Sequence, residues 1–274
     1  MSMTVSSNVG VLSSLRSILE NEKATHATLA KLSSGKRING AQDDAAGLAV
    51  AVDLIAQLTS TNQAARNGQD ALGVADTADA ALGDSTDILD RLDQLAMQAG
   101  SGALSDSDRQ DIQVESDALT SELDRIAHAT EFNGAALLSA RASLTYQVGA
   151  GSVPANDQLA ITTGDATAAT LGVGGLDLST QASAAGALGN IGAALQALSS
   201  TRATLGAQAN RAASAIDDAR QSAIGLAAAS GSILDANIAE ETSNLSRQLI
   251  LGQAGISVLA QANQDPKAAL RLLG

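Results

Sequence analysis

Apolar residues in the second half of the chain recur at alternating spacings of three and four residues. The series is Leu188, Ile191, Leu195, Leu198, Arg202, Leu205, Ala209, Ala212, Ile216, Ala219, Ala223, Leu226, Ser230 and Ile233. Such a heptad repeat places one seam of a helix against a partner helix. At 1.5 Å per residue this helix would be about 65 to 70 Å long. Its polar members, Arg202 and Ser230, either set the register or carry stems that reach water.

The first half of the chain contains a matching partner. Its seam consists of Ala75, Ala78, Leu82, Ser85, Leu89, Leu92, Ala96 and Ala99. A shorter amphipathic pattern from Ser105 to Thr130 predicts a third helix, with Ser105 or Ser107 as its N-cap and the "FNG" turn at 132–134 as its end. Three helices with Leu and Ala seams predict an elongated bundle.

The two ends of the chain carry similar apolar stripes. The N-terminal stripe is Val5, Val9, Leu12, Leu15, Leu19, Leu29 and Leu32, and the C-terminal stripe is Leu234, Ile238, Leu245, Leu249, Ile256 and Leu259. The spacing of eleven residues between Leu234, Leu245 and Ile256 favours a nearly straight helix. The period therefore changes near residue 233, which indicates a change of partner there.

Residues 139–182 differ from the helical halves. The alternating segments "SLTYQV" and "DQLAI" are separated by Gly, Pro and Asn, which predicts a β-hairpin. The chain would then leave through helices, turn in this β region and return through one long helix, so that the terminal stripes lie side by side. The predicted fold is mainly α, an elongated antiparallel helical bundle or coiled coil with a small β-hairpin region.

Composition narrows the possible functions. The chain has 274 residues, no Cys and a formal net charge of -13, which argues against nucleic acid and membrane surfaces as partners. Aromatic residues make up only 1%, so the core must consist of Ala, Leu, Ile and Val. The segment "MSMTVSSNVG" has no basic region followed by an apolar one, so we expect neither Sec-type secretion nor a membrane span.

The familiar chemical motifs are incomplete. Lys36 is followed by Arg37 where a P-loop needs Ser or Thr, and "GVGGLD" has Asp177 at the third glycine position of a dinucleotide fingerprint. "SDSDRQD" has Asp111 where a calcium loop needs Gly, and neither His26 nor His128 belongs to an HExxH motif. The sequence predicts no catalytic, cofactor-binding or metal site and therefore no enzyme.

Three long motifs carry a family resemblance. They are "LSSGKRINGAQDDAAGLAVA" at 32–51, "SELDRIAHATEFNGAALL" at 121–138 with "YQVGA" at 146–150, and the segment from "ILDANIAEE" to the end at 233–274. In this order and at these distances from both ends they resemble bacterial flagellin. The resemblance covers residues 4–150 and 185–274. It implies a non-enzymatic structural subunit that self-assembles into the helical tube of the flagellar filament, the propeller for swimming.

The resemblance also implies a division into domains. Residues 1–43 and 234–274 would form an inner coiled-coil domain. Residues 44–140 and 186–233 would form the helices of a second domain, and residues 141–185 would form its β-hairpin and short variable loop. The self-assembly residues would be Val5, Val9, Leu12, Leu15, Leu19, Leu29, Leu234, Ile238, Leu245, Leu249, Ile256 and Leu259.

Partners and location follow from the same resemblance. Family members are exported through the type III apparatus of the flagellum without a cleaved signal peptide. The implied partners are other copies of the chain, an export chaperone that holds the C-terminal helix, and the filament cap and hook-junction proteins. The implied location is extracellular, in the flagellar filament.

The segment between the first two helical patterns is interpreted as an inter-domain joint. Gly35 and Gly40 would break the N-terminal helix, and Asp43 and Asp44 would lie near the start of the next helix, where its dipole favours anions. Lys36 and Arg37 would pair with these acids, either within one subunit or across to a neighbour.

A further set of residues bears on immune recognition. Arg91, Leu95 and Glu115 match positions through which some flagellins bind a host Toll-like receptor, whereas Asp93 and Gln94 depart from the usual Arg-Glu. The alternative interpretation is that these residues are exposed or lie at a filament interface.

Two other functions are compatible with the helical pattern. One is the hook-filament junction protein, which shares the terminal patterns of flagellin. The other is a secreted helical adhesin or effector, although that class would leave the paired terminal motifs unexplained.

Overall fold

The computed structural model describes the backbone of residues 9–273 and the side chains of residues 9–264. The chain divides into two compact units. The first consists of residues 1–56 and 225–274, and the second consists of residues 57–224.

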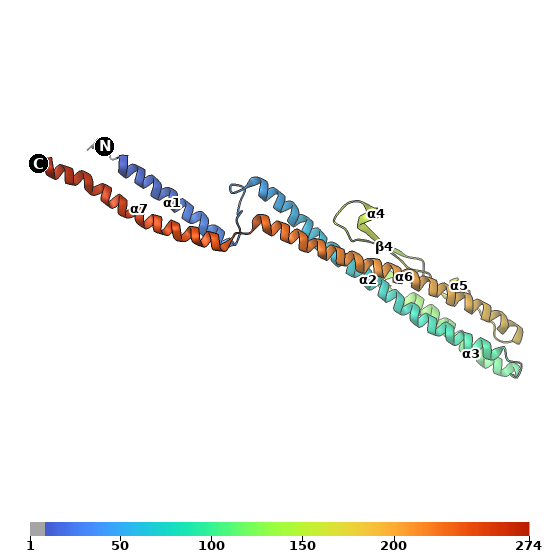
Figure 1. Cartoon of the computed structure of the whole chain (residues 1–274). Coiled ribbons are helices and arrows are strands. Elements are labelled where there is room, and N and C mark those ends of the chain that lie inside the picture. The colour runs from blue at the N-terminus through green and yellow to red at the C-terminus, as the bar shows by residue number, and fades with distance from the viewer. Residues whose placement is uncertain (1–8, 274) are drawn as a thin grey trace. The chain divides into compact units, whose positions relative to one another are not determined.

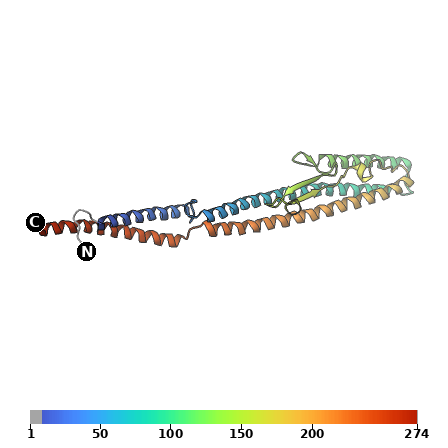
Figure 2. The same ribbon diagram turned by 90° about the horizontal axis from the view of Figure 1, so that it is seen from above.

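The first unit is built on two terminal helices. Helix α1 (Val9–Ser34) and helix α7 (Ile238–Leu273) lie side by side in both views (Figures 1 and 2). They run antiparallel, because Lys31 near the end of α1 contacts Glu241 near the start of α7. The unit also contains the first turns of α2 (Ala45–Ala99) and the last turns of α6 (Gln181–Leu234). A small buried cluster of Ile38, Ala51 and Leu234 joins these parts.

The second unit is a helical bundle formed by α2, α6 and α3 (Asp106–Ala129). Every predicted seam residue of α2 between Ala75 and Ala99 is buried, and the predicted α6 seam is buried or half-buried throughout. The two heptad predictions are therefore confirmed. Because the core consists of Leu, Ile, Val and Ala, its packing comes from many small contacts along the helices.

Helix α3 starts as the sequence predicts. Ser105 is the N-cap, and it forms a capping box with Asp108, whose carboxylate accepts hydrogen bonds from the Ser105 hydroxyl and amide. These bonds lower the pKa of Asp108. The helix ends at Ala129, before the "FNG" turn, which instead connects β1 (Glu131–Phe132) to β2 (Ala135–Ala136). Both Asn133 and Gly134 have positive φ, as a tight hairpin turn requires.

The predicted β-hairpin is present. Strand β3 (Ser143–Gln147) pairs antiparallel with β4 (Gln158–Thr162), so that Thr145 lies opposite Ala160. A single helical turn, α4 (Pro154–Asp157), lies in the loop between them, and α5 (Ala168–Leu171) follows β4. Hydrogen bonds from Asn67 to the Gln147 carbonyl and from the Thr162 amide to Gln208 attach the hairpin to α2 and α6.

Candidate self-assembly surface and helix connection

The seam between α1 and α7 combines apolar residues with polar residues that bind across it. The Asn21 side-chain amide donates to the Gln248 carbonyl oxygen at 2.8 Å, and the Gln248 side-chain amide donates to the Thr28 hydroxyl at 3.1 Å. Lys31 and Glu241 form an ion pair at 3.4 Å. Thr28 is 5% exposed, so these bonds form in a partly dry seam. The pair is held in register by specific hydrogen bonds rather than by interlocking leucines.

Two glycines of α7 allow the helices to approach closely. A Cβ atom added at Gly255 would lie 3.0 Å from Ile18, and one added at Gly252 would lie 3.2 Å from the Asn21 amide nitrogen. Both positions lie on the seam. The space that larger side chains would occupy is therefore filled by α1 itself.

Most of the predicted self-assembly residues lie on the surface of this unit. Their exposed fractions range from 43% at Leu15 to 67% at Val9, and the exposed set is Val9, Leu12, Leu15, Leu19, Leu29, Ile238, Leu249 and Ile256. Isolated exposed apolar residues are ordinary, but this many on one pair of helices indicates a surface that another molecule covers.

Three predicted residues are placed differently from the rest, and one is outside the described range. Leu234 is buried, because it packs against Ile38 and Ala51 at the helix connection. Leu245 and Leu259 are half-buried in α7. Leu234 therefore packs within its own chain rather than lying on the surface. Val5 lies outside the described residues.

Sequence reasoning missed three exposed apolar residues of α7. Ile250 is 69% exposed, and Leu251 and Val258 are also exposed. Leu249, Ile250 and Leu251 are consecutive, and consecutive residues of a helix point in different directions. The triplet "LIL" was therefore a signal that α7 carries apolar surface on more than one side.

The connection between α1 and α2 begins at Gly35. Its φ of +69° lies in the left-handed region, which glycine adopts without strain and which ends α1. The Arg37 amide donates to the Leu234 carbonyl at 2.6 Å, and the Ala236 amide donates to the Gly35 carbonyl at 2.9 Å. Together with the bridge between Lys36 and Asp235, these bonds join the α1–α2 connection to the α6–α7 connection.

The charged residues of this connection bind backbone groups. The Arg37 guanidinium donates to the Ile233 carbonyl at 2.7 Å. Asp43 accepts from the Asn39 amide at 2.9 Å and from the Gly40 amide at 3.2 Å, and Asp44 accepts from the Gly47 amide at 2.9 Å as the N-cap of α2. Within the chain, the Arg37 guanidinium therefore binds the end of α6 rather than Asp43 or Asp44.

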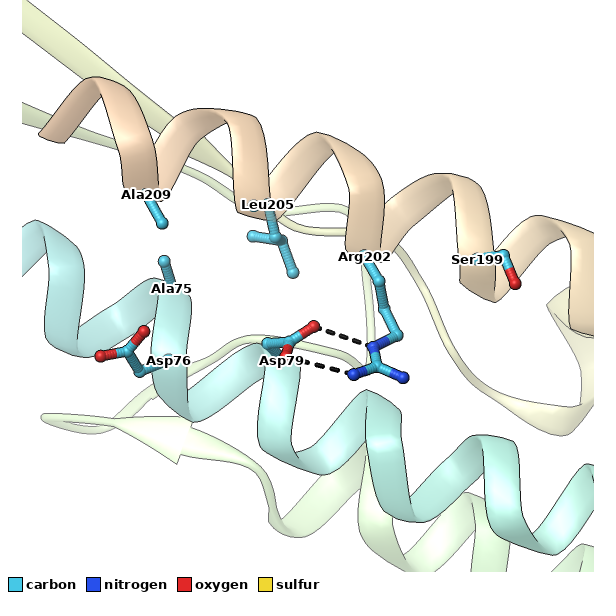
Figure 3. Close-up of a pocket in the computed structure, with 8 residues that line it drawn as sticks. Ala75, Asp76, Asp79, Ser199, Arg202, Leu205 and Ala209 are labelled. Carbon is cyan, nitrogen blue, oxygen red and sulfur yellow. Dashed lines mark hydrogen bonds and ion pairs between the residues drawn. The ribbon is translucent and has the colours of Figure 1, made fainter. Parts of the chain in front are cut away.

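The second unit contains a groove between α2 and α6 of about 440 Å³ (Figure 3). Arg202 reaches across it and binds Asp79 through two nitrogens, at 2.9 and 3.3 Å. Asp79 raises the pKa of Arg202 through this hydrogen-bonded pairing. The small side chains of Ala75 and Ala209 leave the groove open beside Leu205 (Figure 3). Arg202 thus links α6 to α2 across the groove.

Comparisons with known proteins identify the family. The model of the bacterial flagellin N-terminal helical region matches residues 5–143, and the model of the bacterial flagellin C-terminal helical region matches residues 188–273. The chain belongs to the bacterial flagellins. Flagellins are structural proteins, so this chain is a structural subunit of the flagellar filament.

Two relatives, from Bacillus subtilis and Treponema pallidum, agree with this assignment. The flagellin of Bacillus subtilis (strain 168) is 36% identical over 303 residues, which cover 99% of this chain and all of the relative. Flagellin FlaB1 of Treponema pallidum (strain Nichols) is 35% identical over 288 residues, with the same coverage. The crystal structure of Bacillus cereus flagellin is 30% identical, with a TM-score of 0.48, and covers 56% of this chain and 88% of that chain.

The residues considered for immune recognition in this flagellin do not form one surface. Arg91 binds Glu115 at 2.7 Å through a guanidinium nitrogen, and both side chains are exposed. Leu95 is 1% exposed and belongs to the core. Leu95 therefore points into the core from α2, the same helix that carries Arg91, and offers no surface to a partner.

Among the described residues, no group of three or more His, Cys, Asp or Glu side chains is arranged to hold a metal ion. A search of the same residues found no helix long and apolar enough to cross a membrane.

Proposed function

We propose that this flagellin polymerises through the exposed apolar residues of α1 and α7. The observation that carries the proposal is the run of side chains, from Val9 to Leu29 and from Ile238 to Val258, that the α1–α7 pair leaves in water. Fully burying a Leu or Ile side chain stabilises a contact by about 1.5 to 3 kcal/mol. Half-exposed residues would contribute roughly half of that each. Several such contacts per subunit would be enough to drive assembly.

The helix connection would set how the terminal helices are presented to neighbouring copies. Gly35, Lys36, Arg37, Gly40, Asp43 and Asp44 form this joint in our proposal. Its support is the set of backbone bonds that hold residues 35–37 against residues 233–236. Substitutions that loosen these bonds would alter filament form before they alter the second unit.

The same apolar surface suggests how the subunit is handled before assembly. An exposed, consecutive triplet such as Leu249, Ile250 and Leu251 would aggregate in a concentrated solution of monomers. We propose that an export chaperone covers α7, that the subunit leaves through the flagellar type III apparatus, and that cap and hook-junction proteins meet the terminal helices at the filament ends. The finished filament would be extracellular and would have no enzymatic activity.

The proposal is tested by changing one exposed leucine at a time. Leu15→Glu and Leu249→Glu should abolish salt-induced filaments seen by electron microscopy, because each places a charge in the contact. Lys23→Glu is the matched control, because Lys23 is exposed and lies two residues from both Asn21 and Thr25, on the side of α1 opposite the seam. Helical circular dichroism should be unchanged in all three variants.

Three results would count against this proposal. Filaments of normal length from Leu15→Glu and Leu249→Glu would show that these residues are not in the contact. Short polymers from the unaltered chain would favour the hook-filament junction function, and a failure to polymerise would favour an adhesin. A variant that lacks residues 234–274 should stay soluble, with the second unit folded and without filaments.

Receptor recognition remains a separate proposal. The exposed pair of Arg91 and Glu115 offers charged atoms on neighbouring helices. A Toll-like receptor reporter assay with purified monomer, compared with an Arg91→Ala variant, would test it.

A further inference from the structure

The chain contains three Asn-Gly pairs, and such a pair can react internally. The pairs are Asn39-Gly40, Asn67-Gly68 and Asn133-Gly134. The amide nitrogen of the glycine can attack the side-chain carbonyl carbon of the asparagine, because glycine has no Cβ atom to hinder the approach. The surroundings of each pair decide whether its asparagine reaches the geometry for this attack.

The pair within α2 is held by several contacts. The Asn67 side-chain amide donates to the Gln147 carbonyl oxygen at 2.8 Å, and the Asn67 side-chain oxygen accepts from Gln63 at 2.9 Å. Gly68 is buried, and a Cβ atom added there would lie 2.7 Å from Ile216 of α6. Because the asparagine must rotate towards the glycine nitrogen, these contacts oppose the reaction.

The pair in the helix connection has an exposed asparagine, but both of its reacting groups are bonded. The Gly40 amide donates to the Asp43 carboxylate at 3.2 Å, and the Asn39 side-chain amide donates to the Lys36 carbonyl oxygen at 3.4 Å. The glycine amide must lose its proton during the attack, and the negative charge of Asp43 opposes that loss. Exposure alone therefore does not make Asn39 reactive.

The pair in the turn between β1 and β2 is exposed and lacks such bonds. Within the part of the chain that the structure describes, neither the Asn133 side chain nor the Gly134 amide has a hydrogen-bond partner. A Cβ atom added at Gly134 would meet nothing within 4 Å, so there is room for a change of conformation. Each flanking strand has only two residues, and so short a hairpin opens readily.

We propose that Asn133 is a site of spontaneous deamidation, with water as the only co-reactant. The Gly134 nitrogen forms a bond to the Asn133 side-chain carbonyl carbon as the bond from that carbon to the side-chain nitrogen breaks. Ammonia leaves and takes with it the proton that the Gly134 amide loses. Water then opens the resulting five-membered ring at either of its carbonyls, which yields aspartate or isoaspartate at position 133.

The isoaspartate product changes the packing beside the turn. Isoaspartate lengthens the main chain by a carbon atom, whereas a turn between such closely paired strands requires a defined backbone geometry. The Leu137 amide closes this hairpin by donating to the Thr130 carbonyl at 3.0 Å. The Phe132 ring lies against α2, where a Cβ atom added at Gly73 would be 3.7 Å from it. Both contacts should weaken as isoaspartate accumulates with the age of the protein.

Peptide mapping measures the reaction at each pair separately. The full-length protein is kept at low salt and neutral pH in oxygen-18 water, so that only an asparagine that reacts during the incubation gains heavy oxygen. Cleavage after arginine separates Asn39, Asn67 and Asn133, because Arg66 and Arg125 lie between them. Mass spectrometry should show Asn133 reacting about 10 to 100 times faster than Asn39, the factor that a hydrogen bond to a charged group supplies. Asn67 should also react more slowly than Asn133.

The same incubation in guanidinium chloride tests whether the fold is the cause. The three asparagines should then react at similar rates, because each is followed by glycine and none keeps its folded surroundings. Faster reaction at Asn39 or Asn67 in the folded protein would overturn the proposal, and so would the absence of heavy oxygen at Asn133. A preference for Asn133 that persists in the denaturant would also overturn it.

A matched variant tests the effect on the hairpin. Asn133→Gly removes the reacting side chain and keeps a turn sequence that tolerates positive φ. After incubation, the Leu137 amide should exchange its hydrogen faster in the unaltered chain and at its original rate in Asn133→Gly. Equal exchange in the two aged proteins, with isoaspartate present in the unaltered chain, would refute the predicted change in packing.

Discussion

Gly35 and Gly40 flank the same short connection, yet only one of the two positions requires a glycine. Gly35 has a φ of +69°, whereas Gly40 does not adopt a positive φ, and a Cβ atom at either position would meet nothing within 4 Å. Substitution by alanine therefore differs between the two sites only in backbone strain. An alanine held in the left-handed conformation costs about 1 to 2 kcal/mol.

The expected size of the effect comes from comparing how often the connection opens in the two alanine variants. Replacing glycine by alanine also restricts the unfolded chain, which stabilises the folded state by about 0.4 to 1 kcal/mol. This contribution is common to Gly35→Ala and Gly40→Ala, so it cancels in the comparison. We expect the connection to open about 5 to 30 times more often in Gly35→Ala than in Gly40→Ala, which corresponds to that 1 to 2 kcal/mol.

Hydrogen exchange measures this opening directly. The Arg37 amide is bonded to the Leu234 carbonyl and the Ala236 amide to the Gly35 carbonyl, so both exchange when the two connections separate. Their exchange rates should rise together in Gly35→Ala and remain at the original value or fall in Gly40→Ala. Equal rates in the two variants would refute the reasoning that positive φ at Gly35 holds the connection in shape.

Three further changes test other parts of the structure. A double-mutant cycle on Arg202 and Asp79, both partly exposed, should give a coupling of about 0.2 to 1 kcal/mol by denaturant unfolding, and zero coupling would contradict their bond. Gln248→Met should speed hydrogen exchange in the α1–α7 pair by a factor that corresponds to about 1 kcal/mol or more, because it removes the hydrogen bond to the buried Thr28 hydroxyl; unchanged or slower exchange would contradict this. Burial raises the pKa of Asp165, but hydrogen bonds from Thr167 and Thr170 outweigh it and lower that pKa overall. Its stabilisation is present above its unfolded pKa and is lost as the pH falls, so Asp165→Asn should flatten the acid side of the stability curve measured by thermal unfolding.

The second unit follows from the sequence because its elements obey simple periods. The seam of α2 and the seam of α6 consist of Leu, Ile and Ala at heptad spacing, and these residues are buried. The β3–β4 hairpin follows from alternation and from the Gly- and Pro-containing loop. Local pattern and tertiary packing agree in these segments, so the pattern alone is informative.

The first unit is different because most of the apolar stripe that can be read from its sequence lies outside the seam between α1 and α7. Asn21, Thr28 and Gln248 hold α1 against α7, and an apolar pattern does not register polar residues that form a seam. The stripe through Leu12 and Leu19 instead faces outward. The regular spacing of this stripe therefore does not correspond to contacts within one chain. Likewise, the acceptors of Arg37 are backbone carbonyls, which no residue type in the sequence specifies.

The bonds between the two connections have a mechanical consequence. Residues 35–37 and residues 233–236 belong to chain segments that are far apart in sequence, yet amides on each side donate to carbonyls on the other. Tension applied to α1 would therefore pass into the α6–α7 connection as well as into α2. Because backbone groups on two polypeptide paths share the load, the connection would resist twisting better than either path alone.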